Sequence, residues 1–554
     1  MARKVAIGIQ DFGDLIRNNC FYVDKTQFIK EWWDSGDSVT LITRPRRFGK
    51  TLNMSMLEYF FSNRYEGHGE IFEGLSIWEE ERFRDLQGTY PVINLSFANV
   101  KEKTYQQTKE RMYQIIIELY NKNTFLLNSG LLTEQEQGYY RSIRENMPET
   151  TATMALHRMT DFLCRYFRKK VIILLDEYDT PMQEAYVHGY WDELVAFTRS
   201  MFNSTFKTNP YLERAVMTGI TRVSKESVFS DLNNLKVVTT TSNEYATAFG
   251  FTQDEVFKAM DEIGMSQKEE VKKWYDGFVF GSVSDIYNPW SIINFLDTGK
   301  IITYWANTSG NSLVSKLIRE GSRGIKEQFE TLLQGNVIEA KLDEQIVYNQ
   351  LEQSESTIWS LLIASGYLKV IEVEIAEEVY KLKLTNYEVV RMFQNMVSGW
   401  FGEKDGNYND FVKALLLDDI DAMNEYMNRV ALNIFSSFDT GKRPSGMEPE
   451  RFYHGFVLGL IVDLRDKYIV TSNRESGFGR YDIMLEPLKE GNAIIIEFKV
   501  FNQRREKTLE DTLKAALSQI EEKNYAQILL SHGFELQCIK KYGFAFEGKN
   551  VLIG

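Results

Sequence analysis

The amino-acid sequence predicts an α/β protein whose N-terminal domain has three layers around a parallel sheet. Two continuous apolar runs, VIILLD at 171–176 and AVMTG at 215–219, are typical of parallel strands buried on both faces. Shorter strand-like runs at 38–43 and 91–97 are separated from them by stretches with helical spacing. Strands that alternate with helices favour a parallel sheet covered by helices on both faces.

The later part of the chain changes character twice. After the strand-rich region the sequence is mainly helical and acidic, and TIWSLLIASGYLKVI followed by EEVYKLKLTN indicates a helix and a strand pair, as in a winged-helix-like module. A cluster of Gly, Pro and basic residues at 438–446 is the best candidate linker. We therefore expect three domains: a three-layer α/β domain at 1–285, a helical middle or lid region at 286–440, and a C-terminal α/β domain at 441–554.

Composition narrows the classes of function. The net charge of -14 is unusual for a protein whose main task is coating nucleic acid, although most of this charge lies before residue 445. Three widely spaced cysteines exclude a disulfide framework and favour a reducing compartment. The opening residues turn polar too early for a secretory signal, and no apolar run is long enough to span a bilayer. We expect a cytoplasmic protein without a membrane partner.

The loop TRPRRFGKT at 43–51 has the chemistry of a phosphate-binding site. Gly49 allows close approach, Lys50 reaches the outer phosphates and Thr51 supplies a hydroxyl for Mg²⁺. Arg44 stands where the usual pattern has its first glycine, so a basic surface turn is the alternative. The residues that we expect to contact ATP here are Arg46, Arg47, Phe48, Gly49, Lys50 and Thr51.

Acidic residues that close the strand at 171–176 strengthen this interpretation. Asp176 is placed to hold Mg²⁺, and Glu177 beside it to polarise an attacking water, although acids after a buried strand also open ordinary solvated loops. Thr218 ends the next strand and is a candidate sensor of the γ-phosphate. Arg222 is a candidate phosphate contact, with a surface arginine as the alternative.

A second constellation lies near the C-terminus, in GRYDIMLEP followed by LKEGNAIIIEFKV. These read as a hairpin in which Glu497 and Lys499 share one face and Asp482 lies opposite them. Two carboxylates are suitable ligands for Mg²⁺, and the lysine can orient a water that the metal activates. This is the D…E-x-K pattern of PD-(D/E)XK nucleases, although E-x-K alone is common on exposed strands.

Further residues extend the nuclease-like pattern. The segment AALSQIEEKNY brings Gln519, a candidate catalytic residue, and Tyr525, as in many members of that superfamily. Glu450, on a preceding helix, is a candidate for the metal site. Weaker candidates, each as easily a surface charge, are Glu475, Arg480, Arg504 and Arg505.

Taken together, the motifs resemble a bacterial family that joins an N-terminal AAA-ATPase-like domain to a C-terminal PD-(D/E)XK nuclease-like domain. The resemblance covers nearly the whole length, and RPRRFGKT resembles that family's normal form of the loop. The stretches that carry it are FYVDKTQFI, RPRRFGKT, VIILLDEYDTP, TGITRVSKESVFSDLNN, YDGFVFG, YNPWSI, YWANTSGN, GRYDIML and IIIEFKV.

These observations lead to two hypotheses of function. The first is an ATPase that controls an Mg²⁺- or Mn²⁺-dependent nuclease acting on DNA, with a homo-oligomer as a further expectation for an AAA-like domain. The second is a regulatory ATPase switch whose nuclease-fold domain binds a partner or nucleic acid without cutting it; the acidic charge favours this.

Overall fold

The computed structural model describes most of the chain, and some residues within helices and strands are described by their backbone alone. The described residues are 4–222, 228–229, 232–306, 314–315, 317–318, 323–342, 355–374, 379–400, 408–434, 453, 457–458, 460–461, 464, 467–476, 479–489 and 491–554. Contacts divide the chain into two compact units, residues 1–317 with 335–390 and residues 318–334 with 391–554. The domain boundaries expected at 285 and 440 stay predictions.

A five-stranded parallel sheet forms the centre of the N-terminal region. Its strands are β1 (Val39–Thr43), β2 (Val92–Ser96), β3 (Val171–Asp176), β4 (Leu212–Gly219) and β5 (Leu235–Val238). They lie in the order β2-β3-β4-β1-β5, and every neighbouring pair is parallel. All side chains of β1 and β3 are buried, as their continuous apolar runs predict.

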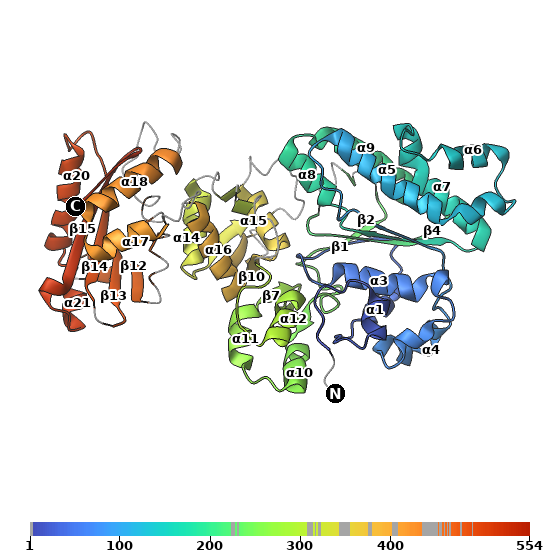
Figure 1. The fold of residues 1–554 in the computed structure, drawn as a ribbon, viewed down its shortest axis with the longest axis horizontal. Coiled ribbons are helices and arrows are strands. Elements are labelled where there is room, and N and C mark those ends of the chain that lie inside the picture. The colour runs from blue at the N-terminus through green and yellow to red at the C-terminus, as the bar shows by residue number, and fades with distance from the viewer. Residues whose placement is uncertain are drawn as a thin grey trace. The chain divides into compact units, whose positions relative to one another are not determined.

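Helices cover both faces of this sheet, so the expected three-layer α/β architecture is confirmed. One group lies on one face in Figure 1 and comprises α1 (Phe12–Arg17), α3 (Lys50–Phe61) and α4 (Glu81–Arg84), with α2 (Gln27–Ser35) preceding β1. The opposite layer comprises α5 (Tyr105–Lys122), α6 (Glu134–Ser142), α7 (Glu149–Phe167), α8 (Thr180–His188) and α9 (Trp191–Phe206).

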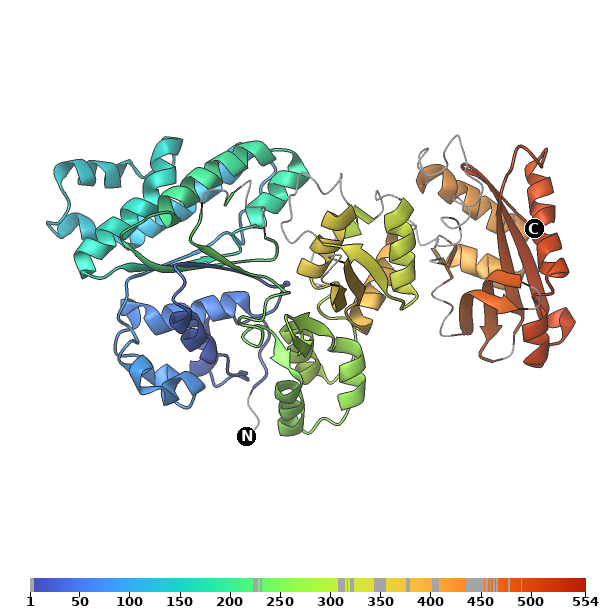
Figure 2. The ribbon, with the colours of Figure 1, turned by 180° about the vertical axis from the view of Figure 1, so that it is seen from behind.

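A small helical layer follows β5 in the same unit. It contains β6 (Phe251–Thr252), α10 (Gln253–Ile263), α11 (Lys268–Tyr275), β7 (Phe278–Phe280), β8 (Val283–Tyr287) and α12 (Pro289–Thr298). The three short strands pair in the order β6-β8-β7. A buried core of Val256, Tyr275, Tyr287 and Phe295, among others, holds the three helices together, and Figure 2 shows them grouped around this small sheet.

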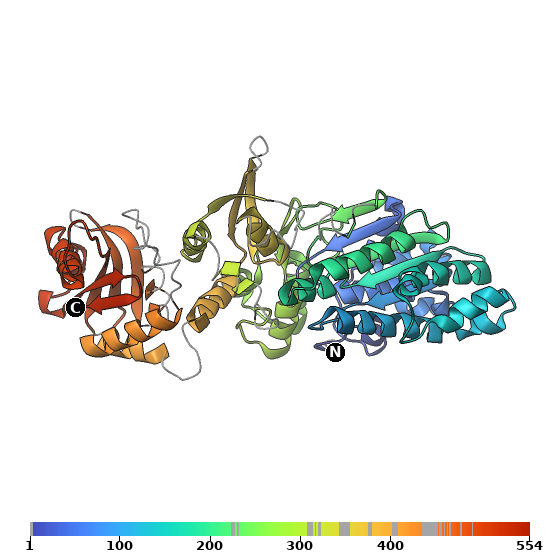
Figure 3. The same cartoon turned by 90° about the horizontal axis from the view of Figure 1, so that it is seen from above.

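The expected helix-and-hairpin module is present in the middle of the chain. Its elements are β9 (Ile338–Lys341), α15 (Glu355–Ala364), β10 (Leu368–Glu374), β11 (Val379–Leu384) and α16 (Tyr387–Trp400), preceded by α14 (Arg323–Leu333). The strands are antiparallel in the order β10-β11-β9, and Figure 3 shows the long β10–β11 hairpin. The described side chains of α15 are almost all buried, so this helix packs in the core.

The C-terminal region is built on a mixed sheet. Its strands are β12 (Tyr468–Ser476), β13 (Gly479–Pro487), β14 (Ala493–Val500), β15 (Ile539–Glu547) and β16 (Asn550–Ile553), in that order across the sheet. Only β14 and β15 among the described pairs run parallel. One face packs on α17 (Tyr408–Leu417) and α18 (Ile420–Ile434), and the other on α20 (Leu509–Glu522) and α21 (Gln527–Ser531). Among the described residues, no helix is long and apolar enough to cross a membrane.

Candidate nucleotide and metal sites

The predicted phosphate loop joins β1 to the N-terminus of α3. Gly49 immediately precedes the helix with φ of 81°, a left-handed conformation that glycine adopts without strain. Arg47 also has a left-handed conformation, with φ of 66°, which is uncommon for a residue with a Cβ. The loop therefore delivers the unpaired N–H groups of the first helical turn to the carboxyl edge of the sheet, where an anion can bind.

Arg44, at the position of the missing glycine, has a structural role. Its side chain is fully buried, and its guanidinium donates hydrogen bonds to the backbone carbonyls of Thr43, Thr239 and Glu244. It also lies over the ring of Phe280, 4.6 Å from the centroid. Burial lowers the pKa of Arg44 to about 9, against the opposing charge of Glu244. The arginine therefore ties the start of the loop to the segment that follows β5.

Lys50 lies inside the loop with only 5% of its side chain exposed. Its ammonium donates hydrogen bonds to the carbonyl oxygens of Arg44, at 2.9 Å, and Pro45, at 2.8 Å. Burial lowers the pKa of Lys50, while the nearby charges of Glu177, Asp176 and Asp179 raise it. A desolvated cation is thus held at the centre of the loop, where it is available to a phosphate.

Thr51, in the first turn of α3, meets Asp176 and Thr218 at the carboxyl ends of the adjacent strands β3 and β4. Thr51 Oγ1 donates a hydrogen bond of 2.7 Å to Asp176 Oδ2, and Thr218 Oγ1 donates one to Asp176 Oδ1. β4 lies between β1 and β3, which places Thr218 directly beside Asp176. Burial raises the pKa of Asp176, and the two hydroxyl donors lower it. A hydroxyl and a carboxylate are oxygen ligands of the kind that Mg²⁺ takes, so these residues fit the ion.

Two acids follow Asp176 and have different surroundings. Glu177 is half-buried with φ of 51°, and its carboxylate accepts a hydrogen bond of 3.2 Å from Thr180 Oγ1. Asp179, which sequence reasoning missed as a site residue, is buried and accepts hydrogen bonds from the backbone N–H groups of Ile220 and Thr221. Asp179 therefore fixes the segment after β4. The sequence signal that could have identified Asp179 was its position at the end of the run Asp-Glu-Tyr-Asp.

The other residues that we expected to contact the nucleotide differ in burial and in the residues that they contact. Phe48 is fully buried against the rings of Phe278 and Phe280, so its side chain anchors the loop to β7. Arg47 is exposed and lies 4.3 Å from the centroid of the Trp290 ring. Arg46 is half-buried and donates to Gln183 Oε1 at 3.3 Å, on α8. Arg222 is half-buried and lines a small pocket with Thr43 and Thr239.

Asn288 of the small helical layer and Trp305, which follows that layer in the chain, also reach the loop. Asn288 Nδ2 and Trp305 Nε1 both donate to the backbone carbonyl of Arg46, at 3.3 and 3.0 Å. Sequence analysis gave neither residue a role, although both belong to the motifs YNPWSI and YWANTSGN. Asn288 and Trp305 therefore contribute to the shape of the phosphate loop.

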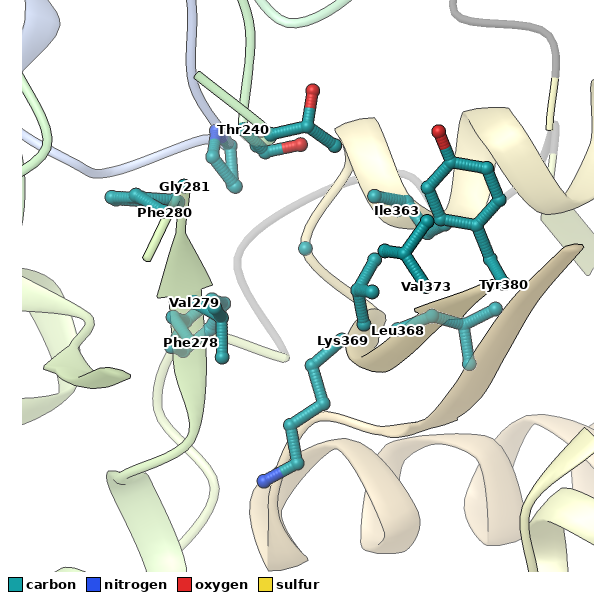
Figure 4. Close-up of a pocket in the computed structure, with 14 residues that line it drawn as sticks. Thr240, Phe278, Val279, Phe280, Gly281, Ile363, Leu368, Lys369, Val373 and Tyr380 are labelled. Atoms are coloured by element: carbon teal, nitrogen blue, oxygen red, sulfur yellow. The ribbon is translucent and has the colours of Figure 1, made fainter. Parts of the chain in front are cut away.

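A pocket of about 310 Å³ lies beside Pro45 of the loop. Figure 4 shows Phe278, Val279 and Phe280 of β7 on one side of it and residues of β10 and β11 on the other. At its edge Gly366, with φ of 82°, approaches the loop closely, because a Cβ there would lie 2.8 Å from the ring of Pro45. The helix-and-hairpin module therefore packs on the outer side of the loop.

In the C-terminal sheet the structure brings Asp482 and Glu497 together. The antiparallel register pairs Ile483 with Ile496, so the next position places Asp482 opposite Glu497. Asp482 Oδ2 accepts a hydrogen bond of 2.8 Å from the backbone N–H of Phe498. Glu497 is 2% exposed, whereas Asp482 and Lys499 are half-buried.

Gln519 joins this pair from α20. Its Nε2 donates hydrogen bonds to Glu497 Oε1 and, at 3.1 Å, to the hydroxyl oxygen of Tyr525, which is 1% exposed. Arg504 and Arg505 are exposed in the loop after β14. Glu450 and the side chains of Glu475 and Arg480 lie outside the described residues.

The donor set at this site fits a divalent cation. Within the part of the chain that the structure describes, no group of three or more His, Cys, Asp or Glu side chains has the arrangement of a metal site. Mg²⁺, however, keeps several water ligands and is commonly held by only one or two carboxylates. Asp482 and Glu497 supply two such carboxylates on neighbouring strands.

Comparisons with known proteins agree with this organisation. Residues 6–229 match the AAA-ATPase-like family, described as a predicted AAA-ATPase, and residues 448–554 match the PD-(D/E)XK nuclease superfamily. The chain is 24% identical over 547 residues to an uncharacterized protein in the vnfD 5' region of Azotobacter chroococcum mcd 1, covering 96% of this chain and 94% of that one.

Among solved structures, the Aeropyrum pernix ORC2 protein (ADPNP-ADP complexes) is 9% identical, covering 67% of this chain and 92% of that chain. Its TM-score of 0.23 is too low to bear on fold or function. The two family matches confirm the resemblance found in the sequence. The chain therefore joins an N-terminal region that matches the AAA-ATPase-like family to a C-terminal region that matches the PD-(D/E)XK nuclease superfamily.

Proposed function

We propose that this protein binds ATP with Mg²⁺ at the 44–51 loop and hydrolyses phosphodiester bonds of DNA at Asp482, Glu497 and Lys499. The observation that carries the nuclease proposal is the buried Glu497, held by Gln519 directly beside Asp482. We place the protein in the cytoplasm, where the free Cys20, Cys164 and Cys538 stay reduced. Assembly into a homo-oligomer is part of the proposal.

At the nucleotide site, each residue has a defined task. The first-turn N–H groups of α3 and the ammonium of Lys50 bind phosphate oxygens. Thr51 and Asp176 would hold Mg²⁺ through the hydroxyl and carboxylate that now share a hydrogen bond. Glu177 orients the attacking water, and Thr218 keeps the Asp176 carboxylate in place. Arg222 is proposed to contact the nucleotide from the segment after β4.

At the nuclease site, Asp482 and Glu497 would hold the divalent cation, with Mn²⁺ as an alternative to Mg²⁺. A bound cation supplies an activated water and neutralises charge on the scissile phosphate. Lys499 shares a strand face with Glu497 and orients the water. Gln519 keeps the Glu497 carboxylate from rotating, because it donates to one oxygen while it also contacts Tyr525.

A cleavage assay tests the proposal. The purified protein is incubated with Mg²⁺ or Mn²⁺ and linear, circular or single-stranded DNA and RNA, with and without ATP. Glu497→Ala abolishes cutting, and Lys50→Ala removes the response to ATP. The matched control is Glu486→Ala, a neighbouring acid on β13 that pairs with the half-exposed His532 at 2.8 Å. Cutting that survives in Glu497→Ala refutes the nuclease assignment.

The alternative function is an ATPase switch whose nuclease-fold domain binds a partner or nucleic acid without cutting. The net charge of -14 favours it, and within it a partner other than nucleic acid, because a strongly acidic chain repels a phosphate backbone. It predicts that ATP binds through Lys50 while no substrate is cut with any metal. A crystal soaked in Mn²⁺ that shows an ion at Asp482 and Glu497 counts against this alternative.

A further inference from the structure

The backbone carbonyl of Arg46 is held from two directions. Asn288 Nδ2 donates to it at 3.3 Å and Trp305 Nε1 at 3.0 Å. Both donors are almost completely buried, with 1% and 3% of their surfaces exposed. They lie more than two hundred residues away in the sequence. These two hydrogen bonds therefore fix the position of the Arg46 carbonyl before any nucleotide binds.

A single carboxylate holds both donors in place. Glu388, in the first turn of α16, accepts a hydrogen bond from Ser291 Oγ at 2.8 Å on one oxygen. Its other oxygen accepts from the backbone N–H of Trp305, at 2.7 Å, and from that of Tyr304. Ser291 lies in the first turn of α12, which Asn288 caps through its own side-chain oxygen. Glu388 thus connects the two elements that contact the loop.

The environment of Glu388 makes this connection stiff. The side chain is 1% exposed, and burial raises its pKa while the Ser291 hydroxyl and the backbone N–H groups lower it. A buried carboxylate that loses one of its donors is left with a large desolvation cost. The segment that carries Ser291 and the segment that carries Trp305 therefore stay bound to Glu388 together. Neither segment moves alone without breaking a buried hydrogen bond.

The geometry of the peptide bond connects this arrangement to the phosphate site. The carbonyl of Arg46 and the N–H of Arg47 belong to one peptide plane, so fixing the carbonyl also aims the N–H. Arg47 has φ of 66°, a conformation that costs energy for a residue with a side chain and persists only when its surroundings impose it. The two hydrogen bonds to Arg46 lie directly next to that strained residue.

We propose that Glu388 and Trp305 are positioning residues that hold the Arg46–Arg47 peptide in the orientation needed to bind the phosphates of a nucleotide. The proposal rests on the proposed function, because it assigns these residues to the same nucleotide site. Trp305 acts through its Nε1 donor, and Glu388 acts by holding the backbone on which Trp305 lies.

The first test measures nucleotide affinity. Trp305→Phe removes the Nε1 donor and keeps an aromatic ring to pack against Phe278 and Tyr367. The control is Trp274→Phe, whose ring packs edge-on against Tyr387 with centroids 4.8 Å apart. Binding of a fluorescent ATP analogue with Mg²⁺ weakens roughly tenfold in Trp305→Phe, the equivalent of one lost hydrogen bond, and stays unchanged in the control. Equal affinity in both variants overturns the proposal.

Variants of Glu388 add a second comparison. Glu388→Ala removes the acceptor for both the Ser291 hydroxyl and the Trp305 backbone N–H. It therefore weakens nucleotide binding more than Trp305→Phe does. Glu388→Gln keeps one acceptor oxygen and an amide that the Ser291 hydroxyl can face, so it recovers part of the lost affinity. An alanine variant that binds the nucleotide as tightly as the wild type contradicts the proposed role of Glu388.

A nucleotide-free measurement separates this proposal from the proposed function. Trypsin cleaves after Arg46 and Arg47, and a peptide held by two side chains resists the local opening that cleavage requires. The rate of loop cleavage, followed by the masses of the fragments, rises about tenfold in Trp305→Phe and not in Trp274→Phe. If the wild type binds no nucleotide, the proposed function fails while this result still stands. An unchanged cleavage rate in Trp305→Phe overturns the positioning role, whatever the affinities.

Discussion

Thr51 and Asp176 are 125 residues apart, yet the Thr51 hydroxyl lies 2.7 Å from a carboxylate oxygen of Asp176. The contact follows from the parallel sheet, because β1 and β3 both deliver the residues after their carboxyl ends to the same edge. Thr218, at the end of the intervening β4, donates to the other carboxylate oxygen. One buried acid is therefore oriented by two hydroxyl groups, one from the first turn of α3 and one from the end of β4.

The Thr51 hydroxyl has an expected effect on nucleotide hydrolysis. Thr51→Ala removes a ligand for the metal of the proposed Mg²⁺–ATP complex and a hydrogen bond to Asp176, so the rate of ATP hydrolysis falls by a factor of roughly 10 to 100. Thr51→Ser keeps the hydroxyl and retains most of the rate. A phosphate-release assay over a range of Mg²⁺ concentrations measures both. Equal rates for the alanine and serine variants would show that the hydroxyl is not used.

Arg44 is expected to contribute to stability. Arg44→Ala leaves the carbonyls of Thr239 and Glu244 without their buried donor, and each unsatisfied acceptor costs about 1–3 kcal/mol in the free energy of unfolding. Urea denaturation followed by circular dichroism measures it. Arg47→Ala, at an exposed position of the same loop, serves as the control. A stable Arg44→Ala variant that has lost nucleotide binding would instead place this guanidinium at the phosphates.

Asp276 makes the stability of the small helical layer depend on pH. Burial, together with a hydrogen bond to Asp285 and the charge of that residue, raises the pKa of Asp276 from 3.8 to about 7. The folded chain therefore keeps a proton that the unfolded chain releases, so this contribution is present at acidic pH and is lost as the pH rises towards 7 and above.

Asp276→Asn tests this dependence, because asparagine keeps an N–H donor for Asp285 and does not titrate. The free energy of unfolding of the wild type declines relative to this variant as the pH rises from about 4 to about 8. Unfolding curves at several pH values give the difference. A difference that does not change with pH would mean that Asp276 titrates as an exposed aspartate does.

Gln519 is expected to matter for the nuclease site without touching the substrate. Gln519→Ala frees the Glu497 carboxylate to rotate, which weakens metal binding and slows cutting by roughly 10- to 100-fold. Titration of Mn²⁺ by calorimetry reports the metal affinity directly. Gln527→Ala, in the short helix that follows, is the control. Wild-type Mn²⁺ affinity in Gln519→Ala would contradict this role.

Local sequence patterns predicted the elements on which both sites lie. The run VIILLD forms the buried β3, and the hairpin drawn from GRYDIML and IIIEFKV forms β13 and β14. These predictions are correct because the residues of a buried parallel strand, or of a short hairpin, are neighbours in the sequence and specify the element themselves. The same locality explains why α20 could be expected to bring Gln519 towards Glu497, since one short crossover separates them.

Contacts between distant segments could not be predicted in this way. The sequence places Arg44 at a glycine position, and only the fold reveals the carbonyls at 239 and 244 that it satisfies. Asn288, Trp305 and Glu388 act on backbone atoms of other segments, and a backbone acceptor has no sequence signature. Among the described strands, the pairing of β9 with β11 was likewise not foreseen from the helix-and-hairpin pattern.

The parallel pairing of β14 with β15 has a consequence for how the chain is made. As the protein leaves the ribosome, the β13–β14 hairpin emerges with Asp482 and Glu497 before α20 supplies Gln519 and before β15 covers the open edge of β14. A parallel partner can arrive only after its crossover has been synthesised. A chain released early by a nonsense codon just after β14 therefore carries Glu497 on an unprotected strand edge, beside Asp482 on β13, which invites aggregation and leaves no ordered metal site.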